Sequence, residues 1–206
     1  MGQHFSTSIP ISDVLTVKTI ATSLFISLWL SCNSWYKFHY SLLDDRKHID
    51  RIKSDFSNSN KLYKEFERLF KSAYSKEQKA LFTNIELLHY SLNRKTINAP
   101  RLIGSLNFEN VLIDYSQKSV PTAYTSVIVK NAKKKNGKLK ASANGVDFGD
   151  MVFINDSERV FAGLFEIIYQ IRCLLVHGDF DPTNDNQEII KYCYLILVDL
   201  MKPFCG

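Results

Sequence analysis

Apolar residues recur at intervals of three and four positions along much of this chain, and this spacing predicts helices. The first apolar stretch is the longest. From about residue 13 to residue 43 it includes Leu24, Phe25, Leu28, Trp29 and Leu43 on one face. At 1.5 Å per residue such a helix would be roughly 45 Å long. We therefore expect a first helix that spans its whole domain.

Shorter helices are predicted over residues 61–72 and 77–93, where charged side chains lie opposite the apolar ones. The polar stretch between residues 44 and 60 is expected to hold a short helix or a loop. These segments and the first helix make the N-terminal half of the chain helical.

Helical patterning is strongest near the C-terminus. An apolar stripe runs from Val160 to Leu175, and Gly178 follows it at a position suited to a left-handed cap. A capping box is expected before the stripe, over residues 155–158. A last helix begins at about Asn184 and ends before Pro203, because proline cannot continue a helix.

The pattern changes between residues 96 and 154, where glycines and prolines interrupt it. Residues 123–131 are rich in β-branched and aromatic side chains, and Asn136-Gly137 is a dipeptide favoured in two-residue hairpin turns. We therefore predict a β-hairpin around residues 123–142, within an irregular insertion over residues 96–154. The whole chain, residues 1–206, is expected to be one mainly α domain, an up-and-down helical bundle that carries this insertion.

The positive charge of the chain is concentrated in the insertion. The formal net charge is +5, and six lysines lie within eleven residues: Lys130, Lys133, Lys134, Lys135, Lys138 and Lys140. A basic segment of this kind attracts phosphates without reading sequence. The last five of these lysines are therefore candidates for binding RNA. The alternative is a solvated hairpin tip, whose charges prevent an edge strand from pairing.

The four cysteines form no C-x-x-C pair, and no residues have the spacing of a metal site, so buried thiols in a reducing compartment are expected. Residues 19–30 are apolar and precede Ser31-Cys32, which faintly resembles a lipoprotein cleavage site. Polar residues interrupt this stretch, and its only positive flank is Lys18. We expect a cytoplasmic protein without a membrane segment, and an exported lipoprotein is a distant alternative.

Arg172 and His177 lie five positions apart at the end of the most strongly patterned helix, directly before its terminating glycine. This arrangement resembles the HEPN superfamily, whose defining motif is an Arg followed four to six residues later by His. On the first helix, Trp29, Asn33 and Tyr36 are similar to a Trp-x-x-x-Asn-x-x-Tyr pattern of several HEPN groups. The resemblance covers most of residues 13–93 and 155–204, and it does not include the insertion.

The resemblance implies an enzyme, a metal-independent endoribonuclease that needs no cofactor. RNA carries its own nucleophile, the 2′-hydroxyl. His177 would be the general acid or base, because an imidazole titrates near neutrality. Arg172 would stabilise the charge that develops on the phosphate, and the product would end in a 2′,3′-cyclic phosphate. Such proteins serve as toxins or anti-phage defence effectors that cleave tRNA or mRNA, which implies an antitoxin or a defence-system partner.

The spacing of the motif adds a geometric condition. Five residues along a regular helix place the two side chains about 140° apart. They converge only if the helix ends between them or if a partner subunit completes the site. Many HEPN proteins are dimers in which two motifs meet in one cleft, so the resemblance implies a homodimer.

Asn33, Cys173 and Asp179 are candidates for shaping the cleft. Cys173 departs from the polar residue, often Asn, that commonly follows the Arg, and Asp179 stands where one antitoxin-controlled group has a modified Tyr. The Cys173 departure keeps a second function open, a non-catalytic HEPN-like module that binds RNA or nucleotide and mediates dimerisation in a larger complex. A third reading is purely structural: Arg172 and His177 complement the negative end of their helix.

Overall fold

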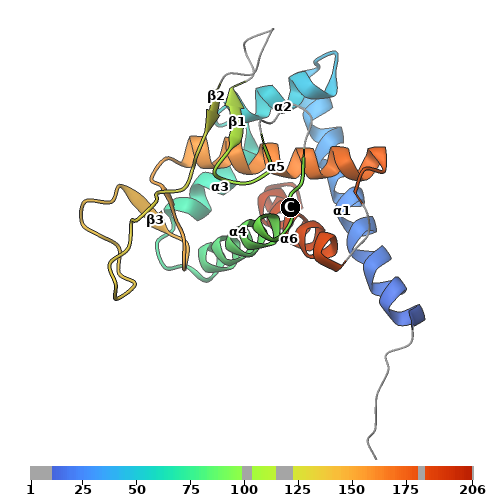
Figure 1. The fold of residues 1–206 in the computed structure, drawn as a ribbon. Helices are drawn as coiled ribbons and strands as arrows, with labels where there is room; N and C mark the ends of the chain where they lie inside the picture. The colour runs from blue at the N-terminus through green and yellow to red at the C-terminus, as the bar shows by residue number, and fades with distance from the viewer. Residues whose placement is uncertain (1–10, 99–103, 115–122, 181–183, 206) are drawn as a thin grey trace, which may run out of the picture.

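In a computed structural model the protein is described over residues 11–98, 104–114, 123–180 and 184–205 (Figure 1). Within these residues it is mainly α, as predicted. The six α-helices are α1 (Ile11–Tyr40), α2 (Asp45–Ser54), α3 (Lys61–Lys71), α4 (Lys76–Arg94), α5 (Ser157–His177) and α6 (Asn184–Met201), and a 3₁₀ turn (Lys202–Phe204) follows α6. The four short strands are β1 (Val111–Asp114), β2 (Ala123–Thr125), β3 (Gly145–Asp147) and β4 (Val152–Ile154).

The helix α5 lies at the centre of the domain. Every residue from 160 to 171 is buried, because α2, α3 and β1 pack around this part of the helix. The helix α6 packs against α1, α3 and α4 and forms a second buried element. Among the described helices, α5 is also the one long and apolar enough to cross a membrane, and most of its apolar part is buried inside the protein.

The first helix is shorter at its C-terminal end than predicted. It ends at Tyr40, and Ser41 takes a left-handed φ of 49°, so the chain turns away from the helix axis there. The side chain of His48 accepts a hydrogen bond from the backbone N–H of Leu42 at 3.1 Å, which fixes the corner. Leu43, expected on the apolar face of the helix, is therefore 95% exposed.

The predicted hairpin over residues 123–142 is wrong in its pairing. Strand β2, at the start of that segment, pairs antiparallel with β1, which precedes it in the chain. The Asn136-Gly137 turn is present, but it joins shorter segments than predicted. The backbone N–H of Lys134 donates to the carbonyl of Lys138 at 2.8 Å, and Gly137 has φ 77°. A second hairpin, β3–β4, lies outside the predicted segment.

The insertion belongs to the same hydrophobic core as the helices. Phe148, after β3, stacks on Phe82 of α4 with ring centres 3.6 Å apart. Phe153 of β4 packs edge-on against Phe108 at 5.3 Å. All four of these rings are buried, so the β3–β4 hairpin is anchored on the helical part of the domain.

Candidate functional site

Both residues of the Arg–His motif lie on α5, whose two ends are capped. At its start, the side chain of Asp156 accepts a hydrogen bond from the backbone N–H of Arg159. At its end, Gly178 adopts a left-handed φ of 77°, and its N–H donates to the carbonyl groups of Leu174 and Leu175. The predicted left-handed cap at Gly178 is confirmed. The predicted capping box over residues 155–158 is wrong by one residue: the N-cap is Asp156, and the third residue of the helix is Arg159, not a Glu that could bond back to the cap.

Arg172 lies where α5 meets α1 and α2. Its Nη1 atom is 3.4 Å from Oδ2 of Asp45, the first residue of α2, and a fifth of its side chain is exposed. Its guanidinium carbon is 6.0 Å from the centre of the Trp29 ring. Arg172 is therefore held by one carboxylate and one aromatic face, and part of its side chain stays accessible to solvent.

Asp45 is itself held from the other side. The hydroxyl of Tyr36 on α1 donates to Oδ1 of Asp45 at 2.6 Å. Burial and this hydrogen bond raise the pKa of Tyr36, so its hydroxyl stays protonated and continues to donate. Tyr36, Asp45 and Arg172 thus form a polar chain that links α1, α2 and α5.

His177 is the last residue of α5 and is exposed, as is its neighbour Val176. Because α5 stays helical through His177, the helix does not end between the two motif residues. Their side chains leave the helix about 140° apart. The first of the two ways to bring them together, an end of the helix between them, is therefore not found in this structure.

Of the three residues expected to shape the cleft, Asn33 and Cys173 are half-buried and Asp179 is exposed. Asn33 lies one turn after Trp29 on α1, and its buried Oδ1 makes no hydrogen bond within the described residues. Cys173 is half-buried, and Arg172 donates to its sulfur at 3.9 Å. Asp179 is exposed beyond the helix end, beside His177, and its backbone N–H donates to the carbonyl of Leu174 at 2.9 Å.

Six residues before Arg172, a buried ionic cluster joins α5 to α2. Glu166 is fully buried, and each of its oxygens accepts a 2.8 Å hydrogen bond from the guanidinium of Arg46. Lys53 contacts the same carboxylate at 2.5 Å. Gln170, one turn along α5, donates to it at 2.7 Å. Asp50 pairs with Arg46 and lies 3.5 Å from Lys53, so two cations and two carboxylates balance.

The electrostatics of this cluster favour the charged carboxylate. Burial alone would raise the pKa of Glu166, but Lys53 and Arg46 outweigh it and lower that pKa to about 2. Glu166 is therefore charged in the folded protein near neutral pH. Because the cluster fixes α2 on α5, it also fixes Asp45, the residue of α2 that contacts Arg172.

The candidate RNA-binding lysines separate into three kinds. Lys133 is not free, since its ammonium pairs with Asp147 at 2.8 Å and donates to the carbonyl of Gly149. Lys140 is half-buried. Lys134, Lys135 and Lys138 are exposed and form no ion pair within the described part of the chain. The predicted basic tip is thus reduced to three accessible lysines on the turn formed by residues 132–140, called the lysine turn below.

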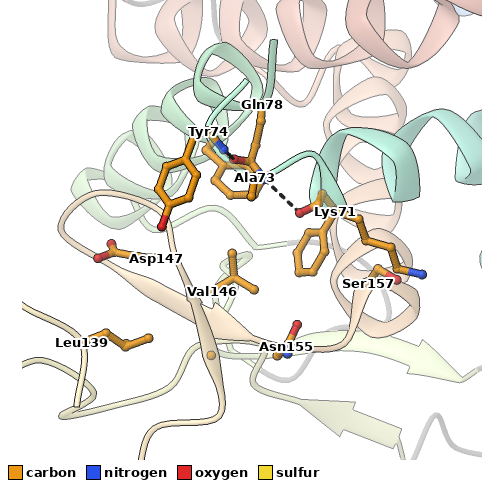
Figure 2. Close-up of a pocket in the computed structure, with 12 residues that line it drawn as sticks. Lys71, Ala73, Tyr74, Gln78, Leu139, Val146, Asp147, Asn155 and Ser157 are labelled. Atoms are coloured by element: carbon orange, nitrogen blue, oxygen red, sulfur yellow. Dashed lines mark hydrogen bonds between the residues drawn. The ribbon is translucent and has the colours of Figure 1, made fainter. Parts of the chain in front are cut away.

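Three cavities lie around the α3–α4 turn, the β3–β4 hairpin and the start of α5, the opposite end of that helix from His177. Two of them, of about 510 and 550 Å³, lie between the α3–α4 turn and the β3–β4 hairpin and share Tyr74, Gln78, Phe82 and Asp147 in their walls. Figure 2 shows the first of the two. A third, of about 450 Å³, lies at the start of α5 around Ser157. None of the three is lined by Arg172 or His177.

Sequence reasoning missed the ionic cluster, the partners of Arg172 and this cavity pair. A signal for the first existed, because Glu166 stands inside the apolar stripe of α5, where a lone carboxylate needs buried partners. Within the described residues, no group of three or more His, Cys, Asp or Glu side chains is placed to hold a metal ion. Comparisons with models of known protein families, with curated proteins and with solved structures find no match to this chain.

Proposed function

We propose that this protein is a metal-independent endoribonuclease of the HEPN type, with Arg172 and His177 as its catalytic pair. The observation that carries the proposal is the placement of this pair: a fifth of the Arg172 side chain is exposed, and His177 is exposed at a capped helix end. The second resemblance is consistent with it, because Trp29 of α1 lies against Arg172. On this proposal the helices form a HEPN-like bundle.

The chemistry requires only groups that the chain and RNA supply. His177 removes the proton from a 2′-hydroxyl or gives one to the leaving 5′-oxygen, and the 2′-oxygen attacks the adjacent phosphorus. The P–O5′ bond breaks as the new P–O2′ bond forms, which leaves a 2′,3′-cyclic phosphate. Arg172 holds the phosphate oxygens while negative charge builds on them.

The proposed site is made by two subunits. Since Arg172 and His177 of one chain diverge, a phosphate bound between them needs a second copy whose α5 end faces the first. The exposed Val176 and His177 would then lie at this interface. RNA, whether tRNA or mRNA, is the proposed substrate, and an antitoxin or defence-system protein is the proposed regulator in the cytoplasm.

One contact favours a second candidate function. Asp45 neutralises Arg172 and would compete with a phosphate for the same guanidinium. A chain in which this pair persists would be a non-catalytic module that binds RNA or nucleotide elsewhere. Mapping RNA ends after induction of the wild type, beside the His177→Ala variant, separates the two functions: only the enzyme produces new ends that depend on His177.

Replacing Cys173 by Asn is expected to retain or raise the cleavage rate. The thiol is a weak hydrogen-bond partner of Arg172, whereas an amide oxygen in its place would orient the guanidinium more firmly. The measurement is the single-turnover rate on an RNA substrate. A wild type without activity that stays inactive as Cys173→Asn would favour the binding module.

Cleavage is also expected to continue in EDTA and to leave cyclic phosphate ends. The acid–base pair and the internal 2′-hydroxyl supply nucleophile, proton transfer and charge stabilisation without a Lewis acid. The measurement is the rate before and after chelation, with the ends identified as cyclic phosphates by their resistance to phosphatase, which acid treatment removes. Loss of activity on chelation that magnesium or zinc restores would contradict the proposed mechanism.

A further inference from the structure

The α3–α4 turn presents an aromatic ring to solvent in an unusual conformation. Tyr74 is 95% exposed and has φ 64°, in the left-handed region that residues other than glycine seldom adopt. The backbone N–H of Tyr74 donates to the side-chain oxygen of Gln78 at 3.0 Å, and the amide nitrogen of Gln78 donates to the carbonyl of Phe70 at 3.0 Å. Gln78 therefore fixes the turn that holds Tyr74 outward.

The ring of Tyr74 stands between two adjoining cavities. Figure 2 shows it extending from the turn towards Asp147 of the β3–β4 hairpin, with Val146 and Leu139 across the opening. The two cavities share Tyr74 as a wall and form one groove, whose base includes Phe82. Because Phe82 is stacked on Phe148, both walls of this groove are anchored in the core.

One wall of the groove is the lysine turn. Lys133, Gly137 and Leu139 of this turn line the cavities, and the exposed Lys134, Lys135 and Lys138 belong to the same turn. Lys79, on α4, lines the facing wall. Of the acidic lining residues, Asp147 pairs with Lys133, whereas Glu86 accepts a hydrogen bond from the backbone N–H of Asp150 and keeps its negative charge. The lining holds Lys71, Lys79 and Lys133 against Asp147 and Glu86, and the three exposed lysines of the turn add further positive charge.

An exposed aromatic face beside unpaired lysines is the combination that binds single-stranded nucleic acid. Bases stack on the ring whatever their identity, and the ammonium groups follow the phosphates. A duplex does not offer a free base face, because its bases already stack on one another. We propose that this groove binds an unpaired segment of RNA, with Tyr74 as its stacking face and Lys134, Lys135 and Lys138 as its phosphate-binding rim.

This proposal deepens the proposed function, on which its choice of ligand rests, and gives the substrate class as RNA with an unpaired segment. The groove adjoins Ser157 at the start of α5, whereas His177 ends the same helix. Twenty rises of 1.5 Å separate the two ends by about 30 Å. The groove therefore binds RNA away from the reacting phosphate, and its residues take no part in proton transfer.

The test measures RNA binding in the His177→Ala background, which prevents turnover. Single-stranded RNA and a duplex of the same sequence are titrated by fluorescence anisotropy. Tyr74→Asn removes the ring and keeps a residue that tolerates a positive φ, and it is expected to weaken single-strand binding about ten-fold. Tyr74→Phe keeps the π face and should bind like the parent. Phe38→Asn, which removes another exposed aromatic ring, is the matched control and should have no effect.

The rim is tested separately with the triple variant Lys134→Gln, Lys135→Gln, Lys138→Gln. Its plot of log affinity against log salt is expected to be less steep, by about 0.7 for each lost contact with a single strand. Equal single-strand binding by Tyr74→Asn and Phe38→Asn would overturn the proposal, as would a Tyr74 effect of the same size on the duplex. Binding of a polyglutamate peptide that depends on Tyr74, with unchanged RNA binding, would assign the groove to an acidic protein and overturn it too.

The two proposals fail in different ways. If wild-type protein cleaves RNA and Tyr74→Asn neither weakens binding nor raises KM, the groove proposal fails alone. If no RNA is cleaved but single-strand binding depends on Tyr74, the nuclease proposal fails and the groove proposal stands. In an active enzyme, Tyr74→Asn is expected to raise KM about ten-fold and to leave kcat unchanged.

Discussion

Replacing His177 by Ala is expected to lower the rate of RNA cleavage by about 10² to 10⁴, the usual contribution of a general acid or base. The histidine is exposed at the end of α5 and is not part of the core, so its loss should leave the fold intact. The measurement is the single-turnover rate on radiolabelled RNA, together with the thermal unfolding curve. His39→Ala, at another exposed histidine, is the control and should retain full activity.

Arg172→Ala is expected to have an effect of similar size, but its control differs. Arg172 contacts Asp45, and its removal leaves that carboxylate with Tyr36 alone. Arg172→Lys keeps the charge and loses the two-pronged geometry that holds a phosphate, so it should rescue folding but little of the rate. Full activity in a folded Arg172→Ala or His177→Ala protein would refute the catalytic assignment.

Mixing the two inactive variants tests whether the site is shared between subunits. A heterodimer of Arg172→Ala and His177→Ala contains one site with both groups intact, if each site takes Arg172 from one copy and His177 from the other. Part of the activity should then return on co-refolding. No recovery, with dimers demonstrated by sedimentation, would mean that one chain supplies both groups, contrary to the geometry of a helix that continues through His177.

The sequence predicted the helices well because their signals are local. The stripe from Val160 to Leu175 and the glycine after it lie within a few turns of one another, and α5 includes the whole stripe and ends at the predicted glycine cap. The prediction for β2 was wrong because the pairing of strands depends on segments that are not adjacent in the sequence. Its partner β1 lies before it, across residues 115–122, and the Asn136-Gly137 signal indicated a turn but not which strands it joins.

In the candidate site, too, local features could be predicted from the sequence and contacts between distant segments could not. A motif on one helix was enough to identify Arg172 and His177, but their neighbours come from distant segments. Asp45 is 127 positions away from Arg172, and no spacing rule connects them. The groove at Tyr74 combines a helix–helix turn with a hairpin from the insertion, so only the folded chain shows that the lysines have an aromatic neighbour.

The largest expected loss of stability follows removal of the Glu166 carboxylate. Glu166→Gln keeps the shape of the side chain but leaves Arg46 and Lys53 as buried cations without their main partner. Breaking a buried pair in this way costs about 3–5 kcal/mol. Glu188→Gln breaks an exposed pair with Arg94 and should cost at most about 1 kcal/mol, which makes it the matched control. The free energy of unfolding from urea titration measures both; equal, small losses would mean that the cluster contributes no more than a surface pair.

The pH dependence of the same variant identifies the carboxylate as the cause. The pKa of Glu166 falls from an ordinary 4.5 to about 2 on folding, so the folded state favours the charged form by about 3 kcal/mol, at 1.36 kcal/mol per pKa unit. This contribution is fully present above pH 4.5, declines as the pH falls and is lost at about pH 2. Glu166→Gln has no proton to bind there. The difference in stability between wild type and variant should therefore shrink from pH 5 towards pH 2, because the carboxylates outside the cluster are the same in both proteins and keep their surroundings. A difference that stays constant over this range would show that the loss arises from packing and not from the charge of Glu166.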